Sequence, residues 1–145
     1  MTEAKKQELI KNLQFFLDNQ SGFSQNMGFR ILDYKDGVVY GEAELRPEFM
    51  NAGHIAHGGY LSTLIDMFGW APNIFYEEKD YDVEERVTTL AMNIHYLGRI
   101  TGPVINCRAS FLKYGGHVKV AQVDLYDGEK GLAVSGVVTY YVPEK

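Results

Sequence analysis

Apolar residues near the start of the chain recur at the spacing of an α-helix. One face of such a helix would carry four of them, which are Leu9, Leu13, Phe16 and Leu17. Thr2 is a suitable N-cap, and the polar run Asn-Gln-Ser-Gly at 19–22 is expected to end the helix. The pattern therefore predicts an N-terminal helical segment within residues 1–22.

Two strand-like runs follow, and Asp36-Gly37 lies between them. Asp-Gly between two such runs is typical of a tight hairpin turn. In the second run, apolar or small residues at 39, 41, 43 and 45 alternate with polar or large residues at 40, 42 and 44. This alternation predicts a strand with one buried and one solvated face, which Pro47 is expected to end.

The segment from His57 to Ala71 shows a different pattern, because large apolar residues fall on nearly every side of a helical projection. A helix that is apolar all round is typically buried. A short loop at 51–56 precedes it, and Pro72 is expected to kink or end it. The acidic stretch 77–85 is predicted to be an exposed loop.

Four long runs rich in β-branched and aromatic residues complete the chain, at positions 87–96, 104–114, 118–126 and 132–142. Sequential pairing of these runs predicts a β meander. The order of elements predicts an α+β fold in which a long, curved antiparallel sheet wraps around one buried central helix. Such a sheet has exposed edges, which pairing of two subunits would remove.

Length, charge and composition narrow the function classes. The 145 residues match the size of one domain, so we expect a single domain over 1–145. A net charge of -5 without a basic run argues against nucleic-acid binding and membrane-surface binding. The N-terminus lacks the apolar core of a signal peptide, and the single cysteine, Cys107, excludes an internal disulfide. These features predict a cytoplasmic protein.

One acid, Asp66, lies nine residues after His57 among the apolar residues of the predicted helix. A carboxyl group in such surroundings holds its proton to higher pH, which suits a general base near neutral pH. The alternative is a structural aspartate that is exposed or hydrogen-bonded on the helix.

The motif His57-Gly58-Gly59 immediately precedes that helix. Two glycines at a helix start allow another group to approach free backbone N–H donors, at the positive end of the helix dipole. Such donors can stabilise the oxyanion of an acyl-transfer intermediate. The alternative is a glycine pair that only permits a tight turn.

Other candidate residues carry weaker signals. Asn51 could orient a water molecule or bind a thioester carbonyl, although an ordinary turn asparagine is the commoner case. His54 and His57 have no third ligand at a convincing spacing, so no metal site is predicted. Cys107 lies in a strand pattern and is expected in the core rather than as a nucleophile. The sequence contains no Gly-x-Ser-x-Gly elbow and no Walker or dinucleotide-binding loop.

Asn51, His57-Gly58-Gly59 and Asp66 together resemble the motif of the PaaI-like branch of hot-dog thioesterases, which is related to the 4-hydroxybenzoyl-CoA thioesterases. The resemblance implies a hot-dog fold and hydrolysis of an acyl-CoA, with coenzyme A as part of the substrate and no metal or prosthetic group. It also implies a homodimer or a dimer of dimers, with the site at the subunit interface. One departure is His54, which stands where the family commonly has a glycine.

The resemblance also implies a role for each residue of the motif. Asp66 would act as general base or as nucleophile. The amide of Gly58, together with that of Gly59, would hold the oxyanion. Asn51 would position the water or the substrate, and His57 would anchor the loop or help to polarise the carbonyl.

The segment at 87–100 resembles the family's strand after the central helix, in which a serine or threonine often reaches the site of the neighbouring subunit. Thr89 occupies that position, with Thr88 as a near alternative. The resemblance therefore implies that Thr89 helps to hold the attacking water across the interface.

Two other functions stay open at this point. A hydroxyacyl dehydratase or hydratase of the same fold would use a histidine with an acid, but its Asp-x-Asn-x-[Leu/Ile/Val]-His run is absent. A non-catalytic acyl-CoA-binding protein would have little reason to keep an acid in an apolar helix. The acyl group is not determined, and either a pocket or the core could contain the aromatic residues Tyr60, Phe68, Trp70 and Phe75. The cations Arg46, Arg99 and Lys113 could meet the phosphates of coenzyme A or be solvated.

Overall fold

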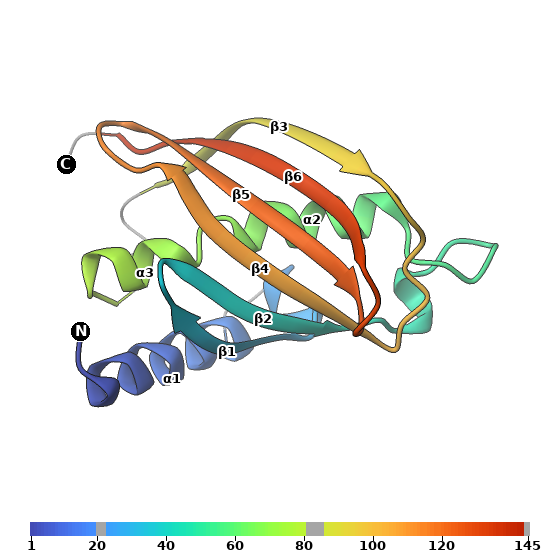
Figure 1. The fold of residues 1–145 in the computed structure, drawn as a ribbon, viewed down its shortest axis with the longest axis horizontal. Helices are drawn as coiled ribbons and strands as arrows, with labels where there is room; N and C mark the ends of the chain where they lie inside the picture. Colours follow the sequence, from blue (N-terminus) through green and yellow to red (C-terminus); the bar gives the residue numbers. More distant parts are fainter. Residues whose placement is uncertain (20–22, 81–85, 144–145) are drawn as a thin grey trace.

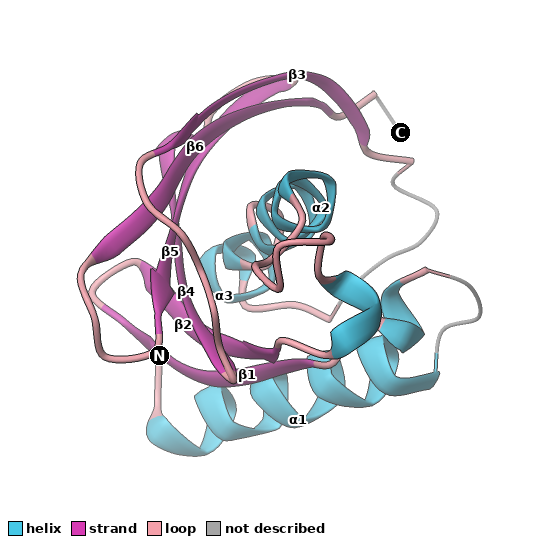
Figure 2. Ribbon diagram, turned by 90° about the vertical axis from the view of Figure 1, so that its right-hand side faces the viewer, coloured by secondary structure: helices cyan, strands magenta, loops and turns pink. Residues whose placement is uncertain are grey.

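A six-stranded antiparallel sheet curves around a central helix, α2, in the computed structural model, which describes residues 1–19, 23–80 and 86–143 (Figures 1 and 2). The strands are β1 (Phe29–Lys35), β2 (Val38–Glu44), β3 (Thr88–Tyr96), β4 (Val104–Lys113), β5 (Val118–Asp127) and β6 (Leu132–Tyr141). The helices are α1 (Glu3–Asn19), α2 (Gly58–Phe68) and α3 (Pro72–Glu77), with short 3-10 turns η1 (Ser24–Asn26) and η2 (Pro47–Phe49). This arrangement confirms the predicted α+β hot-dog architecture.

The β1–β2 hairpin forms where the Asp-Gly signal predicts it. Asp36 and Gly37 have φ angles of 52° and 80°, the two positive values that a tight hairpin turn of the primed type requires. In β2, buried residues alternate with half-buried ones, and Val39, Gly41 and Ala43 face the core. The predicted alternation of the two faces is therefore confirmed.

The strand order corrects the predicted meander. The order is β1-β2-β4-β5-β6-β3, so β4, β5 and β6 pair in sequence but β3 lies beside β6 at the far edge (Figure 1). The segment 97–103 carries the chain from one edge back to the middle of the sheet. It is held by bonds from the backbone N–H groups of Leu97 and Gly98 to the carbonyl of Ala133, and from Leu45 N–H to the carbonyl of Pro103. Turn residues in the sequence indicate where one strand ends and the next begins. They do not indicate that the chain has crossed to another part of the sheet before the next strand.

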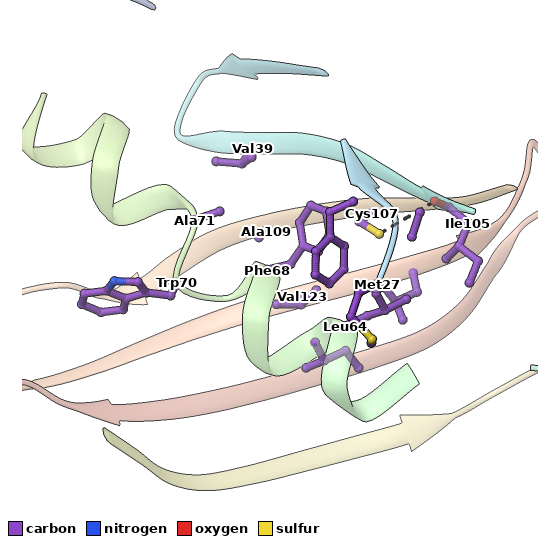
Figure 3. Close-up of a cluster of buried hydrophobic side chains, with 14 of the residues drawn as sticks. Met27, Val39, Leu64, Phe68, Trp70, Ala71, Ile105, Cys107, Ala109 and Val123 are labelled. Carbon is purple, nitrogen blue, oxygen red and sulfur yellow. Dashed lines mark hydrogen bonds between the residues drawn. The ribbon is translucent and has the colours of Figure 1, made fainter. Parts of the chain in front are cut away.

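Helix α2 lies inside the curve of the sheet (Figure 2). It ends at Phe68, and Pro72 begins α3, as expected of a proline at that position. Leu64 and Phe68 of α2 pack with Cys107 of β4 and Val123 of β5 in the main core (Figure 3). The predicted exposed loop at 77–85 begins later than expected, because α3 includes residue 77, and residues 81–85 lie outside the described ranges.

The prediction that α2 is buried on all sides is wrong. Its sheet-facing residues are buried, whereas Ser62, Thr63 and Asp66 are only half-buried. The reason is that the sheet curves around part of the helix and leaves one side open (Figure 2). Ser62, Thr63 and Asp66 form a polar stripe within the apolar run, since residues three and four apart share one helix face.

Close approach between α2 and the sheet depends on a small residue. A Cβ atom added at Gly41 of β2 would lie 2.3 Å from Cε1 of Phe68. A larger residue at position 41 would therefore displace the Phe68 ring, which packs on β2 at this point.

Helix α1 covers the outer edge of β1. The side-chain amide of Gln14 donates to the carbonyl of Phe29 (2.9 Å), and its oxygen accepts from the N–H of Ile31 (2.8 Å). One carboxamide thus takes the place of a neighbouring strand. None of the described helices, α1 included, is long and apolar enough to span a membrane.

Candidate active site

The carboxylate of Asp66 accepts a hydrogen bond from a threonine on β3. Thr89 Oγ1 donates to Asp66 Oδ1 at 2.7 Å. Asp66 lies on the open side of α2, and Thr89 lies on the edge strand that passes that side. The pairing engages one carboxylate oxygen in this bond and leaves the second one for another partner.

This contact joins Thr89 to Asp66 within one chain. The cause of the contact is the crossing of β3 to the far edge of the sheet, which brings its first residues alongside the second half of α2. The implied reach of Thr89 into the site of a neighbouring subunit stays a prediction. Thr88, the near alternative, instead donates to the carbonyl of Arg86 (3.4 Å).

Tyr140 of β6 bonds the backbone of Asp66. The Tyr140 hydroxyl donates to the Asp66 carbonyl at 2.5 Å. Burial raises the pKa of Tyr140, and the nearby charge of Asp66 raises it further, so the hydroxyl keeps its proton and remains a donor. Tyr140 was not predicted as a site residue, because a tyrosine in a strand gives no local sign of its partner on a helix.

At the other end of α2, His57 is the N-cap residue. Its Nδ1 accepts from the backbone N–H of Gly59 at 2.9 Å, which places the ring proton of a neutral histidine on Nε2. The Gly59 amide is therefore engaged, and it is not the free donor that the motif suggested. The His57 side chain itself is exposed.

The amide of Gly58 has a different status. Within the described part of the chain, no acceptor bonds its N–H group, as is usual for the first residue of a helix. Its carbonyl accepts from the hydroxyl of Tyr96, on β3, at 3.0 Å. Strand β3 therefore contacts both ends of the motif, through Thr89 and through Tyr96, and sequence reasoning did not single out Tyr96.

The loop before the helix is a compact turn. Asn51 Oδ1 accepts from the N–H of Gly53 at 2.8 Å, and the Asn51 carbonyl accepts from the N–H of His54 at 3.0 Å. His54 adopts a φ of 59°, a left-handed conformation that glycine enters most easily. The loop therefore needs a glycine-like conformation at position 54 and achieves it with a histidine. Asn51 uses its side-chain oxygen within the turn and remains exposed.

Two hollows open along α2, and they contain different parts of the motif. The Asp66 cavity, of about 560 Å³, is lined by Asp66 and Thr89 and extends toward α1. The His57 hollow, of about 630 Å³, is lined by His57, Gly59 and Tyr60. Thr63 of α2 borders both. The structure therefore places Asp66 with Thr89 in one hollow, and His57 with Gly59 in another.

The four aromatic residues proposed for either a pocket or the core divide between the two. Phe68 and Trp70 are buried and also line the Asp66 cavity. Tyr60 lines the His57 hollow and stacks on Phe49. Phe75 packs in the core against Tyr34.

The remaining candidates are structural or surface residues. Cys107 is buried in β4, and burial raises the pKa of its thiol, so the prediction that it belongs to the core is confirmed. Arg46 lies near Glu44 and Glu48, and Arg99 is exposed. Across the described ranges, no three His, Cys, Asp or Glu side chains form a group that could hold a metal ion.

Comparison with known sequences identifies a related family. The sequence model described as "Thioesterase superfamily" matches residues 53–134, more than half of the chain. Gly58, Asp66 and Thr89 lie inside this match, whereas Asn51 and α1 lie outside it. A protein of Archaeoglobus fulgidus named "Putative esterase" is 28% identical over 71 residues, and this alignment covers 48% of the chain and 46% of the archaeal protein. The chain thus matches about half of that relative's length.

Solved structures show the same fold. A thioesterase from Haemophilus influenzae superposes with a TM-score of 0.78 at 18% identity, covering 93% of this chain and 90% of that one. Zebrafish thioesterase superfamily member 2 gives 0.77 at 23% identity, covering 92% and 98%. A phenylacetic acid degradation-related protein from Ralstonia eutropha gives 0.74 at 16% identity, covering 90% and 99%.

Proposed function

The chain belongs to the thioesterase superfamily, and from that membership we propose that it is an enzyme that hydrolyses an acyl-CoA thioester to a free acid and coenzyme A. In this reaction water adds to the thioester carbonyl, the C–S bond breaks and the thiol leaves with a proton. The observation that carries the proposal is the hydrogen bond between Thr89 and Asp66 at the edge of a cavity on the helix.

Asp66 is proposed as the general base. Its Oδ1 accepts from Thr89, so the orientation of the carboxylate is fixed and Oδ2 can accept a proton from an attacking water molecule. Tyr140 fixes the backbone at the same residue. Asp66 is therefore held at both its carboxylate and its backbone carbonyl. A residue held in this way loses little conformational freedom when its carboxylate binds the water molecule.

The Gly58 amide is proposed as the donor to the oxyanion. It lies at the first turn of α2, where the helix dipole favours negative charge, and it has no acceptor among the described residues. His57 supports this role indirectly. Its ring accepts the hydrogen bond of the Gly59 amide and so stabilises the turn at the start of the helix. Asn51 is proposed to assist through its side-chain NH₂ group, since its oxygen is engaged in the turn.

Base and oxyanion donor lie too far apart to act together in one chain. Gly58 and Asp66 are eight positions apart on α2, which corresponds to about 12 Å along a helix axis. Groups that act on one carbonyl must approach the reacting atoms to roughly 3 Å. We therefore propose that Asp66 and Thr89 of one chain act on a thioester whose carbonyl is bound by Gly58 of a second chain.

The second chain is proposed to be another copy of this protein, paired along β3. This strand is an edge strand, it carries exposed apolar residues, and it contacts both Asp66 and Gly58 through Thr89 and Tyr96. A two-fold axis near β3 would create two equal sites, each with a base from one copy and an amide from the other. Two such dimers could pair further into a tetramer.

The assignment of the branch and of the location is also a proposal. The motif of Asn51, His57-Gly58-Gly59 and Asp66 supports a PaaI-like member that needs no cofactor beyond the coenzyme A of its substrate. The single cysteine is free and buried, which is consistent with a reducing, cytoplasmic setting.

The proposal is tested by free-thiol release from a panel of acyl-CoAs. Asp66→Asn keeps an oxygen for Thr89 but removes the base, so we expect kcat to fall by ~10² or more. Asp124→Asn is the matched control, because Asp124 also accepts from a hydroxyl, that of Ser135 (2.6 Å), but lies outside both hollows. Equal activity of Asp66→Asn and wild type would overturn the mechanism.

A mixing experiment tests the shared site. Gly58→Pro removes the N–H group and adds a ring that this position can accept, because proline is favoured at the first helical position and the ψ of 135° at His57 suits a following proline. Each single variant should lose ~10²-fold or more. Refolding the two inactive variants together should restore about a quarter of wild-type activity, because half of the dimers are mixed and each has one intact site. No recovery would show that base and donor act within one chain.

A further inference from the structure

The Asp66 cavity has polar side chains on α2 and β3, but only apolar side chains line it from α1 and β1. Its polar lining comes from α2 and β3 and includes Ser62, Thr63, Asp66 and Thr89. The opposite wall is formed by side chains of α1, namely Leu13, Phe16 and Leu17, with Phe29 and Ile31 of β1 beside them. A molecule that reaches Asp66 with a polar group would therefore place its apolar part against α1.

The apolar face of α1 is only partly used by the core. Leu9 and Leu13 are buried, whereas Phe16 and Leu17 are half-buried and line the cavity. All four lie on one face, as the helical spacing predicts. The second half of this face thus lines the cavity, and Leu17 also packs against the core.

The charges around the cavity exclude one class of ligand. Among the described residues that line it, none is Lys, Arg or His, and the one charged group is Asp66. A second carboxylate on the ligand would enter an apolar space without a counter-ion, and it would share that space with Asp66. An uncharged apolar group meets neither cost.

The volume indicates the size of the ligand group. A cavity of about 150 Å³ lined by apolar residues binds benzene. The Asp66 cavity holds about 560 Å³, part of which the thioester and the attacking water must fill. The remainder exceeds what an acetyl group needs and suits a medium-length alkyl chain or an aromatic ring.

From these observations, and resting on the proposed thioester hydrolysis, we infer that α1 forms the end wall of an acyl subsite that takes uncharged, apolar acyl groups larger than acetyl. Phe16 is the residue that sets the length of the acyl group. The thioester lies at Asp66 and Thr89, and the acyl chain extends between α2 and β1 toward α1. Because α1 lies outside the matched residues 53–134, this wall belongs to a part of the chain beyond the family match.

A pair of matched substrates tests the chemistry of the subsite. Butyryl-CoA and succinyl-CoA differ only in a terminal methyl group or carboxylate. We expect kcat/KM to be ~10²-fold higher for butyryl-CoA, since the carboxylate has no partner in the cavity. From acetyl-CoA to octanoyl-CoA, kcat/KM should rise by up to about fourfold for each buried methylene group. Equal rates for butyryl- and succinyl-CoA, or for acetyl- and octanoyl-CoA, would overturn the subsite.

A pair of neighbouring variants tests the end wall. Phe16→Ala opens the wall, so the ratio of kcat/KM for dodecanoyl-CoA to that for octanoyl-CoA should rise by about tenfold, which is less than the full gain of four buried methylene groups. Phe15→Ala removes the adjacent phenyl ring, which is exposed and outside the cavity, and should leave the ratio unchanged. The readout is a ratio within one protein sample, so partial unfolding does not alter it. Phe16→Leu, a smaller change, should move the ratio in the same direction.

A binding measurement separates this inference from the proposed function. Calorimetry with the Asp66→Asn protein should show octanoyl-CoA binding at least tenfold more tightly than succinyl-CoA, and adding Phe16→Ala should raise the affinity for dodecanoyl-CoA relative to octanoyl-CoA. If no acyl-CoA is hydrolysed but octanoyl-CoA still binds more tightly than succinyl-CoA, hydrolysis is wrong and the apolar subsite stands. If hydrolysis occurs but Phe15→Ala and Phe16→Ala give the same chain-length profile, the end wall is wrong and the hydrolase stands.

Discussion

The two edge strands of the sheet, β1 and β3, differ in whether another element of the chain covers them. At the β1 edge, α1 lies alongside the strand, and Gln14 bonds both the carbonyl of Phe29 and the N–H of Ile31. At the β3 edge, the strand pairs with β6 on its inner side, and none of the described elements pairs with its outer side (Figure 1). One edge is thus covered within a single chain, and the other is left open.

The open edge is also the apolar one. Leu90, Met92 and Tyr96 of β3 are 56%, 42% and 52% exposed, respectively, in the single chain. A long edge strand with exposed apolar residues promotes association, and proteins that stay monomeric usually add charge, proline or a covering segment there. This chain has such a covering segment at β1. Among the described residues no such segment covers β3, which favours the proposed pairing with a second copy.

The comparison also explains where the site lies. Thr89 and Tyr96, the two β3 residues that contact Asp66 and Gly58, both belong to the open edge. The covered edge instead provides the apolar wall of the Asp66 cavity. In the proposed dimer, the reacting groups lie at the edge where the two chains meet, and the proposed acyl-binding wall lies at the edge that α1 already covers.

The largest effect is expected from a charge on the open edge. Leu90 is the extra residue in the bulge between Thr89 and Ala91. In Leu90→Lys, pairing along β3 would bury an unpartnered ammonium group twice, once from each copy, at a cost of several kcal/mol. We expect sedimentation to show monomers, and thioesterase activity to fall by more than ~10-fold at concentrations where the wild type is dimeric.

The chain offers a closely matched control for that substitution. Leu112 is also a bulge residue, between Phe111 and Lys113 of β4, and it is 59% exposed. Leu112→Lys should leave size and activity as in the wild type. Dissociation by Leu112→Lys but not by Leu90→Lys would mean that β3 is not the contact edge.

The next effect is expected at the covered edge. Gln14→Leu leaves the carbonyl of Phe29 and the N–H of Ile31 without their partner, so the free energy of unfolding should fall by about 1–3 kcal/mol. Gln7→Leu on the same helix is the control, because Gln7 bonds only the exposed side chain of Glu3. It should cost no more than a few tenths of a kcal/mol. Urea unfolding measures both, and equal losses would show that Gln14 does not act as a substitute strand.

A smaller effect is expected for the hydroxyl that joins the open edge to the base. Thr89→Val keeps the shape of the side chain but removes the donor to Asp66, and kcat should fall by roughly tenfold, the equivalent of one hydrogen bond to a charged group. Thr88→Val, next to it, should have no such effect, because Thr88 bonds a backbone carbonyl outside the site. The reverse outcome would assign the supporting role to Thr88.

Local features of the covered edge were predictable from the sequence. The Asp36-Gly37 turn, the alternation along β2 and the apolar face of α1 each depend on residues close together in the chain, and the structure confirms them. The motif also marked the start of α2 and the acid within it. These features follow from backbone geometry and periodicity, which a short segment determines by itself.

The open edge could not be predicted in the same way. The place of β3 beside β6 depends on pairing between residues that are 38 to 53 positions apart, which no turn signal encodes. The contacts of Thr89 with Asp66 and of Tyr96 with Gly58 follow from that placement. The use of the Gly59 amide by His57 depends on a side-chain rotamer, so the motif alone suggested two free amides where the structure has one.

The smallest effect is expected from an ion pair that helps to hold α1 on the covered edge. Lys6 of α1 lies 2.9 Å from Asp33 of β1, and the hydrogen bond from Lys6 lowers the pKa of Asp33. A lowered folded-state pKa stabilises the protein fully above the unfolded value of about 3.9, and the contribution disappears as the pH falls through the folded value. Asp33→Asn should therefore be less stable than wild type near neutral pH and equally stable in acid. The difference should be small and should shrink with added salt, since the pair is partly exposed. Activity per active site should not change, because the substitution affects the covered edge alone. If Asp33→Asn instead abolished the pairing proposed at β3, the packing of α1 on β1 would be coupled to that pairing, and the two edges would not be independent.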